Sequence, residues 1–124
     1  MGWTVFAAET LEWTDRGDGS DRSIARLSDS LTNMRSNVWR YRPGARGRRH
    51  AERVQEELFV VLTGSPSVLL GDPPERVDLT PGSAVVVQPG TPLQVRNDGA
   101  SDATLLIVGA PPQTGEADYF PDID

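Results

Sequence analysis

Cysteine and long apolar runs are both absent from this chain of 124 residues. Without cysteine the protein has no disulfide, no thiolate metal ligand and no thiol nucleophile. A membrane helix requires roughly 18 to 20 consecutive apolar residues, and no stretch of the sequence comes close to that length. The first residues also lack the basic and apolar regions of a secretory signal. We therefore expect a protein without membrane contact that resides in the cytoplasm.

Lysine is absent too, so all twelve basic residues are arginine, and the net charge is -6 at pH 7. Nucleic-acid binding requires a basic face, so this acidic balance argues against it. Six arginines nevertheless fall between positions 40 and 53, where Glu52 alone opposes them. Arginine binds carboxylate and phosphate groups bidentately. Arg46, Arg48 and Arg49 therefore form either an anion-binding rim or an ordinary solvated surface that balances an acidic protein.

No long segment shows convincing helical periodicity. The sequence instead contains short segments that are rich in Val, Leu and Ile. Turns with Gly and Pro separate these segments about every ten residues, which is typical of a β-sandwich or β-barrel. The expected strands lie at residues 23–27, 37–42, 57–63, 67–70, 76–79, 83–87, 93–96 and 103–108. The length corresponds to one domain with its own core.

Three segments lack the strand pattern. We expect one helical turn within residues 27–36, because LSDSLTNMRS is polar and contains no Gly or Pro. Residues 14–21 and 111–124 are rich in Asp, Gly and Pro, and we expect both to be loosely held. The second of them is an acidic tail that either caps the mouth of the barrel or lies free.

The expected strand at 57–63 has apolar side chains on both faces. Phe59 and Val61 share one face, and Leu58 and Val60 share the other. A strand that is apolar on both faces needs cover on its outer side. Either the N-terminal segment of the same chain or a second subunit supplies that cover, and we expect a homodimer.

Histidine is nearly absent, and the single copy, His50, lies within GARGRRHAERVQEELFVVLTG, residues 44–64. Two carboxylates follow it closely, at Glu52 and Glu57. On extended backbone, residues two apart point to the same side, so His50 and Glu52 share a face. One imidazole and two carboxylates form a candidate metal-binding group, which would favour Mn²⁺, Fe²⁺ or Mg²⁺ over Cu⁺.

This stretch resembles the first motif of the cupin superfamily, G-x5-H-x-H-x3-4-E-x6-G. Gly44, His50, Glu57 and Gly64 stand at the matching positions, and Glu52 replaces the second histidine.

A second stretch, GSAVVVQPGTPLQVRN, resembles the second cupin motif, G-x5-P-x-G-x2-H-x3-N. Gly82, Gly90 and Asn97 match, and Pro89 stands one residue late. Leu93 occupies the position of the motif's histidine. Together the two motifs and the segment between them cover residues 44–97.

The resemblance implies an all-β protein with the double-stranded β-helix, or jelly-roll barrel, of the small RmlC-like cupins. It implies one cupin domain over residues 1–124, with the barrel motifs at about 37–110. N-terminal strands would occupy 1–36 and the acidic tail 111–124. The ligand pocket would lie inside the barrel. In metal-binding cupins the motif residues hold Fe, Mn, Ni, Zn or Cu.

Two of the four metal-ligand positions keep the family's residue, at His50 and Glu57. Glu52 is a substitute ligand, whereas Leu93 has no ligand atom. The metal site is therefore either weakened, holding Mn, Fe, Ni or Zn through His50, Glu52 and Glu57, or absent. If the metal site is absent, the buried negative charges of the carboxylates must be neutralised in another way. They can pair with Arg48, hold a protonated His50 between them, or share a proton.

Three functions remain open from the sequence, and it assigns no catalytic residue. The first is a metal-free protein that binds a small molecule in the barrel. The second is a divalent-metal enzyme of the isomerase or dioxygenase type. The third is a structural or partner-binding dimer without a small-molecule role. In the first two, the expected pocket residues are His50, Glu52, Gln55, Glu57, Phe59, Leu93 and Val95.

Overall fold

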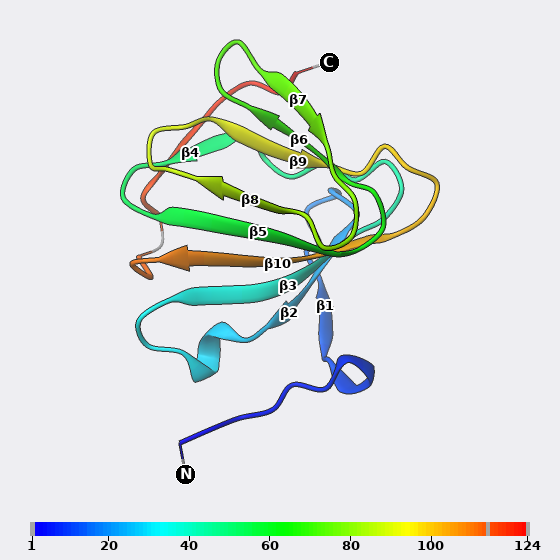
Figure 1. The fold of residues 1–124 in the computed structure, drawn as a ribbon, viewed down its shortest axis with the longest axis vertical. Helices are drawn as coiled ribbons and strands as arrows, with labels where there is room; N and C mark the ends of the chain where they lie inside the picture. The colour runs from blue at the N-terminus through cyan, green and yellow to red at the C-terminus, as the bar shows by residue number, and fades with distance from the viewer. Residues whose placement is uncertain (1, 114, 124) are drawn as a thin grey trace.

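Two antiparallel sheets face each other in the computed structural model (Figure 1), which describes residues 2–113 and 115–123. Met1, Thr114 and Asp124 lie outside the described residues. The larger sheet contains, in spatial order, β1 (Trp13–Asp15), β2 (Arg22–Arg26), β3 (Arg35–Tyr41), β10 (Ala103–Ala110), β5 (Glu56–Thr63) and β8 (Ala84–Val87). The smaller sheet contains β11 (Ala117–Tyr119), β4 (His50–Glu52), β9 (Leu93–Arg96), β6 (Ser67–Leu70) and β7 (Glu75–Asp78).

Helix is limited to two short 3₁₀ turns among the described residues, η1 (Ala8–Thr10) and η2 (Ser28–Ser30). The second lies inside residues 27–36, where one helical turn was expected. Each of the eight expected strands corresponds to a strand of the structure, and β6 and β9 have the expected bounds. The all-β prediction is therefore confirmed.

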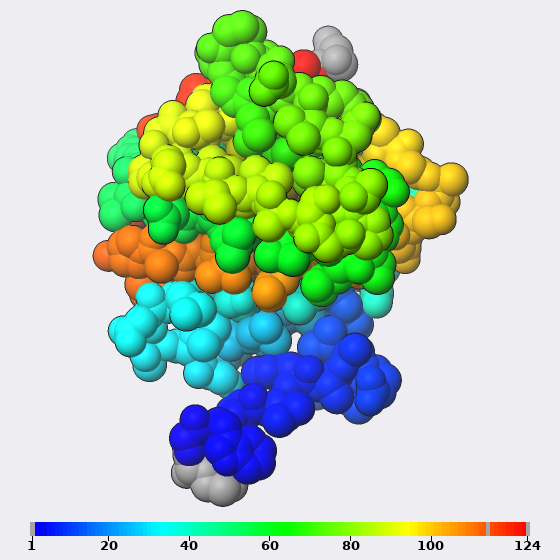
Figure 2. All heavy atoms as spheres, in the orientation of Figure 1, coloured from blue at the N-terminus to red at the C-terminus, as the bar shows by residue number. Residues whose placement is uncertain are grey.

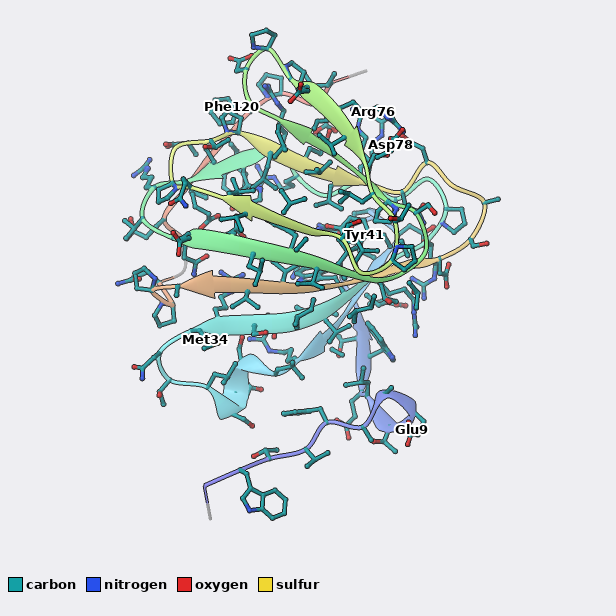
Figure 3. All side chains as sticks on the ribbon, in the orientation of Figure 1. Glu9, Met34, Tyr41, Arg76, Asp78 and Phe120 are labelled. Carbon is teal, nitrogen blue, oxygen red and sulfur yellow. The ribbon has the colours of Figure 1, made fainter. Side chains whose placement is uncertain are left out.

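The core lies between the two sheets. Side chains alternate along β5, so that Glu57, Phe59 and Val61 are buried while Leu58 is exposed. The buried apolar residues that pack together come from both sheets: Tyr41, Ala45, Phe59, Val61, Val68, Leu79, Val87, Leu93, Val95 and Leu105. Each fully buried large side chain stabilises the fold by about 1.5–3 kcal/mol. Figure 3 shows Tyr41 within this arrangement, with Arg76 and Asp78 on β7 at the sheet edge.

Gly64 directly follows β5 and adopts a backbone conformation that requires glycine. Its φ is +81°, and an added Cβ would lie 2.6 Å from the carbonyl oxygen of Asp102. The chain therefore turns sharply there, which brings the end of β5 beside the start of β10. This close approach explains why glycine occupies the last position of the first motif.

The prediction that residues 111–124 are loosely held is wrong for the described part of that segment. Strand β11 pairs with β4, with Ala117 opposite Glu52 and Tyr119 opposite His50. The backbone N–H of Phe120 then donates to the carbonyl of Arg49 at 3.0 Å. Figure 3 shows Phe120 at the smaller sheet. The sequence pattern did not reveal this pairing because a three-residue strand has too few positions to show alternation.

The prediction for residues 14–21 is also wrong. Thr14 and Asp15 belong to β1, which pairs with β2. The carboxylate of Asp18 accepts hydrogen bonds from the backbone and the hydroxyl of Ser20, at 3.0 and 2.5 Å. It also forms an ion pair with Arg22 at 3.5 Å. This segment is therefore held to the larger sheet.

The chain's own N-terminal segment, one of the two alternatives for covering the outer face of β5, does not cover it. That segment packs beside Ala25 and Arg26 of β2, and Figure 2 shows it below that strand, away from β5 and β8. Leu58, Leu62 and Val86 are 36%, 46% and 63% exposed. The alternative of a second subunit remains a prediction.

Candidate functional site

Three side chains of the 44–64 stretch meet between the sheets. His50 and Glu52 project from β4, and Glu57 projects from β5 across the barrel. The Nε2 atom of His50 lies 3.2 Å from Oε2 of Glu52 and 3.8 Å from Oε1 of Glu57. One ligand atom of each residue lies within 4.8 Å of the others. The three residues, which are close in the sequence, therefore also lie close enough in space to hold one metal ion together.

The ring of His50 is oriented by the backbone. Its Nδ1 lies 2.9 Å from the carbonyl oxygen of Arg48. Because a carbonyl only accepts, Nδ1 carries a proton and donates to it, which leaves Nε2 facing the two carboxylates. Metal-binding histidines commonly use such a backbone hydrogen bond to fix their orientation.

Glu57 contains an unsatisfied buried atom. Its Oε1 is buried and has no hydrogen-bond partner among the described residues. The distance of 3.8 Å to His50 is too long for a hydrogen bond. A buried polar group without a partner destabilises the fold by about 1–3 kcal/mol, and more when it is charged. The unsatisfied oxygen therefore marks a position where a cation or a proton donor fits.

The pKa values of the group reflect this crowding. Burial alone lowers the pKa of His50, but the interaction with Glu57, the hydrogen bond to Arg48 and the charge of Glu52 raise it above 6.5 overall. Burial, followed by the charge of Glu57, raises the pKa of Glu52 above its usual 4.5, against the opposing charges of His50 and Arg35. Both groups therefore hold their protons more tightly than they do in water.

A cavity of about 260 Å³ lies beside this group. That volume lies just below the range of about 300–1,000 Å³ for ligand pockets. All seven residues expected from the sequence line it: His50, Glu52, Gln55, Glu57, Phe59, Leu93 and Val95. Leu93 is 2% exposed and pairs with His50 on the neighbouring strand. An apolar side chain thus stands next to the histidine.

Gln55 and Gly109 depend on each other in the cavity wall. The amide Nε2 of Gln55 donates to the carbonyl of Gln113 at 2.9 Å. A Cβ added at Gly109 would lie 2.5 Å from Oε1 of Gln55. Glycine in β10 therefore leaves the space that the carboxamide occupies. Sequence reasoning missed Gly109 because nothing in the sequence shows that β10 lies beside β5.

The three arginines of the expected anion-binding rim lie in different places. Arg46 and Arg49 donate to the carbonyls of Ile123 and Pro121, at 3.3 and 3.4 Å, and so hold the C-terminal segment. Arg48 lies at the cavity, with its guanidinium 3.6 Å from the ring centre of Tyr119.

Three further arginines line the cavity, namely Arg16, Arg22 and Arg35. The sequence analysis did not select them because they lie in the N-terminal third, outside the resembling motifs. Arg22 and Ile24 lie two residues apart and so share a face of β2, and this spacing was the one signal available in the sequence.

A jelly-roll barrel with a polar cavity between its two sheets, and a histidine-carboxylate group on the cavity wall, defines the class as the double-stranded β-helix proteins. The family described as the cupin domain matches residues 37–109, more than half of the chain. The chain therefore belongs to the cupin family, as its two motifs predicted.

Solved structures agree with this assignment. A sugar phosphate isomerase of the cupin superfamily from Silicibacter pomeroyi is 26% identical, with a TM-score of 0.79, over 98% of this chain and 83% of that one. The polyketide cyclase RemF of Streptomyces resistomycificus is 17% identical, with a TM-score of 0.82, over 98% and 88%. An RmlC-like cupin of Shewanella frigidimarina is 19% identical, with a TM-score of 0.73, over 88% and 91%. The last two show the fold alone.

Two comparisons gave negative results. No curated protein matches the chain. Within residues 2–113 and 115–123, no helix has the length and apolar character needed to cross a membrane.

Proposed function

We propose that His50, Glu52 and Glu57 hold one divalent cation and that the cavity beside them binds a small molecule on which this centre acts. The observation that carries the proposal is the buried Oε1 of Glu57, which has no hydrogen-bond partner among the described residues. This oxygen lies 3.8 Å from Nε2 of His50. A cation between these atoms offsets the unfavourable burial of charge.

The donor set fits a cation of intermediate or hard character. One imidazole nitrogen and two carboxylates suit Mn²⁺ or Fe²⁺, and Ni²⁺ or Zn²⁺ accept the same ligands. The hydrogen bond from Nδ1 of His50 to Arg48 supports the orientation this binding needs. Leu93 supplies no fourth ligand, so we expect weaker binding than in a centre with three histidines.

We propose an isomerase-type reaction, in which a proton is removed from one carbon of the bound molecule and returned to its neighbour. When bound, the cation polarises an oxygen of that molecule. The carboxylate oxygen of Glu52 that does not bind the cation exchanges the proton. Phe59 and Leu93 exclude water from the wall. The 26% identity to a sugar phosphate isomerase supports this reaction class.

A second candidate is a metal-free pocket, and the distance of 3.2 Å between His50 and Glu52 favours it. In that case a protonated His50 lies between the two carboxylates and neutralises part of their charge. The three residues then form a proton-handling or ligand-binding group without a cation.

Metal content separates the two candidates. Untagged protein, purified without chelators or nickel resin, is measured by plasma mass spectrometry. We expect close to one Mn, Fe, Ni or Zn per chain, and a sharp loss of metal in Glu57→Gln. Glu56→Gln is the matched control, because Glu56 is the exposed neighbour on the same strand. Protein that binds no metal after soaking in Mn²⁺ or Fe²⁺ would contradict the proposal and leave the metal-free candidate.

We also propose that the chain forms a homodimer through the outer face of β5 and β8. Leu58 and Val86 are paired neighbours on that face, and both are exposed. Light scattering coupled to size exclusion tests this directly. We expect a dimer for the wild type and a monomer for Val86→Lys, whereas a monomeric wild type at high concentration would contradict the interface.

A further inference from the structure

We propose that the cavity takes a small molecule with an oxyanion, a carboxylate or a phosphate, which Arg22 and Arg48 bind while the rest of the molecule faces His50, Glu52 and Glu57. The inference rests on the proposed function for the role of those three residues. Its own basis is the distribution of charge around the cavity. Two carboxylates lie on one side of the cavity wall, and arginines lie on the other.

The cationic side comes from the N-terminal strands and the start of β4. Arg22 is 8% exposed, and its NH1 lies 3.4 Å from the hydroxyl oxygen of Tyr41. A Cβ added at Gly47 would lie 3.0 Å from that hydroxyl and 3.4 Å from NH1 of Arg22. The backbone just before Arg48 therefore touches the Arg22 and Tyr41 pair.

Aromatic rings hold these guanidinium groups in place. Arg22 lies 5.0 Å from the ring centre of Trp39, and Arg16 lies 5.5 Å from it. Arg48 lies 3.6 Å from the ring centre of Tyr119. Such cation–π contacts fix a planar guanidinium while leaving N–H groups at its edges to donate to a ligand.

The carboxylates nearby do not neutralise this side. Asp18 pairs with both Arg16 and Arg22, at 3.9 and 3.5 Å, so two cations share one anion. Arg48 has no ion pair within the described residues. Four arginines line the cavity, namely Arg16, Arg22, Arg35 and Arg48, and Glu52 and Glu57 line it as well. With Asp18 counted against them too, four positive charges face three negative ones, and an anionic ligand balances the one that remains.

Arg22 retains free donors as well as charge. Its Nε donates to the hydroxyl oxygen of Ser20, NH1 donates to Tyr41, and NH2 donates to Asp18. A guanidinium carries five N–H bonds, and these contacts use three of them. Tyr41 accepts from Arg22, so its own hydrogen is also left for a ligand. These are the donors that an oxyanion requires.

The test uses three ligands with one carbon skeleton: glycerol, glycerate and glycerol 3-phosphate. They are neutral, a carboxylate and a phosphate ester, and each is titrated into the full chain by calorimetry. The titrations are done after removal of metal with a chelator and again with Mn²⁺. We expect one anion to bind at least about tenfold more tightly than glycerol in both states. The tighter anion identifies the oxyanion as carboxylate or phosphate.

Variants locate the site. Arg48→Gln and Arg22→Gln should each weaken the preferred anion about tenfold or more. Arg40→Gln should not, although Arg40 lies 4.0 Å from the ring centre of Trp13 in a similar stacked arrangement, because Arg40 is not part of the cavity wall. If Arg22→Gln fails to fold, Arg48→Gln and Arg16→Gln decide the question.

Two results would overturn the inference. One is the absence of any preference for an anion over glycerol, and the other is an equal loss in Arg40→Gln and Arg48→Gln. Neither depends on whether the centre at His50 holds a cation, since Mn²⁺ binding is measured separately. Anion binding in chelated protein that takes up no Mn²⁺ supports the oxyanion site while the metal proposal fails.

Discussion

The two sides of the cavity balance their charges in opposite ways. Around Arg22, three of the five N–H bonds already donate to a hydroxyl or a carboxylate, and the guanidinium lies near the ring of Trp39, so the cation is held before any ligand arrives. Around Glu57, two carboxylates crowd one imidazole, and one buried carboxylate oxygen has no hydrogen-bond partner among the described residues. The first side is therefore preorganised, and the second is destabilising until something binds. We infer that removing the charge of Arg22 should lower the free energy of unfolding. Removing the charge of Glu57 should leave it unchanged or raise it.

The largest effect is expected from Arg22→Met, which keeps most of the aliphatic length and removes the guanidinium. The free energy of unfolding should fall by about 2–3 kcal/mol, because buried charge-assisted hydrogen bonds to Ser20, Tyr41 and Asp18 are lost together. Urea denaturation measures this. Arg40→Met is the control, with an expected loss below about 1 kcal/mol. Equal losses in the two variants would show that Arg22 is no better held than a surface arginine.

The next effect has the opposite sign. In chelator, Glu57→Gln should leave the free energy of unfolding unchanged or raise it by about 1 kcal/mol, because it removes a buried carboxylate whose Oε1 has no hydrogen-bond partner among the described residues. In Mn²⁺ the order should reverse, since the wild type gains stability from the bound cation. Melting temperatures in the two buffers give both results. A loss of several kcal/mol in chelator would instead indicate a well-paired buried carboxylate.

A smaller effect concerns His50, whose single copy makes its NMR signals unambiguous. In metal-free protein its pKa should exceed 6.5, and Glu57→Gln should lower it. Because the pKa of His50 is higher in the folded than in the unfolded protein, protonation of His50 adds to the free energy of unfolding. This contribution is complete below pH 6.5 and is lost as the pH rises through the pKa of the folded protein. A pKa at or below 6.5 would mean that burial outweighs the carboxylates.

The smallest effect is expected at Tyr119, which lies beside both His50 and Arg48. Tyr119→Ala should weaken the preferred anion only about threefold, because an exposed cation–π contact contributes about 0.5–1 kcal/mol. The melting temperature should hardly change, since the ring is 54% exposed. A loss as large as that of Arg48→Gln would show that the ring itself contacts the ligand.

The carboxylate side was predictable because its residues are close in the sequence. His50, Glu52 and Glu57 lie within eight positions, and the two-residue alternation of strands orients them. The strands were predictable for the same reason, as alternation and turn residues are local signals. The family match over residues 37–109 agrees with both motifs.

Of the arginine side, Arg48 was selected from the sequence, but Arg22 was not predictable because its position depends on how distant strands pair. Arg22 reaches the cavity only since β2 pairs with β3, and Gly47 lies against it only after the sheets close. The prediction that the acidic tail is loosely held was wrong for a related reason. Its composition suggested a solvated end, whereas β11 pairs with β4. Register between segments far apart in the chain leaves no local trace.

The position of β10 has a consequence for how the chain folds. It lies between β3 and β5, yet it begins at Ala103, 40 positions after β5 ends at Thr63. Until residues 103–110 are available, β3 and β5 both keep an unpaired edge, and the larger sheet, one wall of the cavity, is incomplete. Folding should therefore be slow for the size of the protein, since distant pairing must close large loops first. Chains that stop before residue 103 should aggregate through those open edges rather than form a smaller barrel.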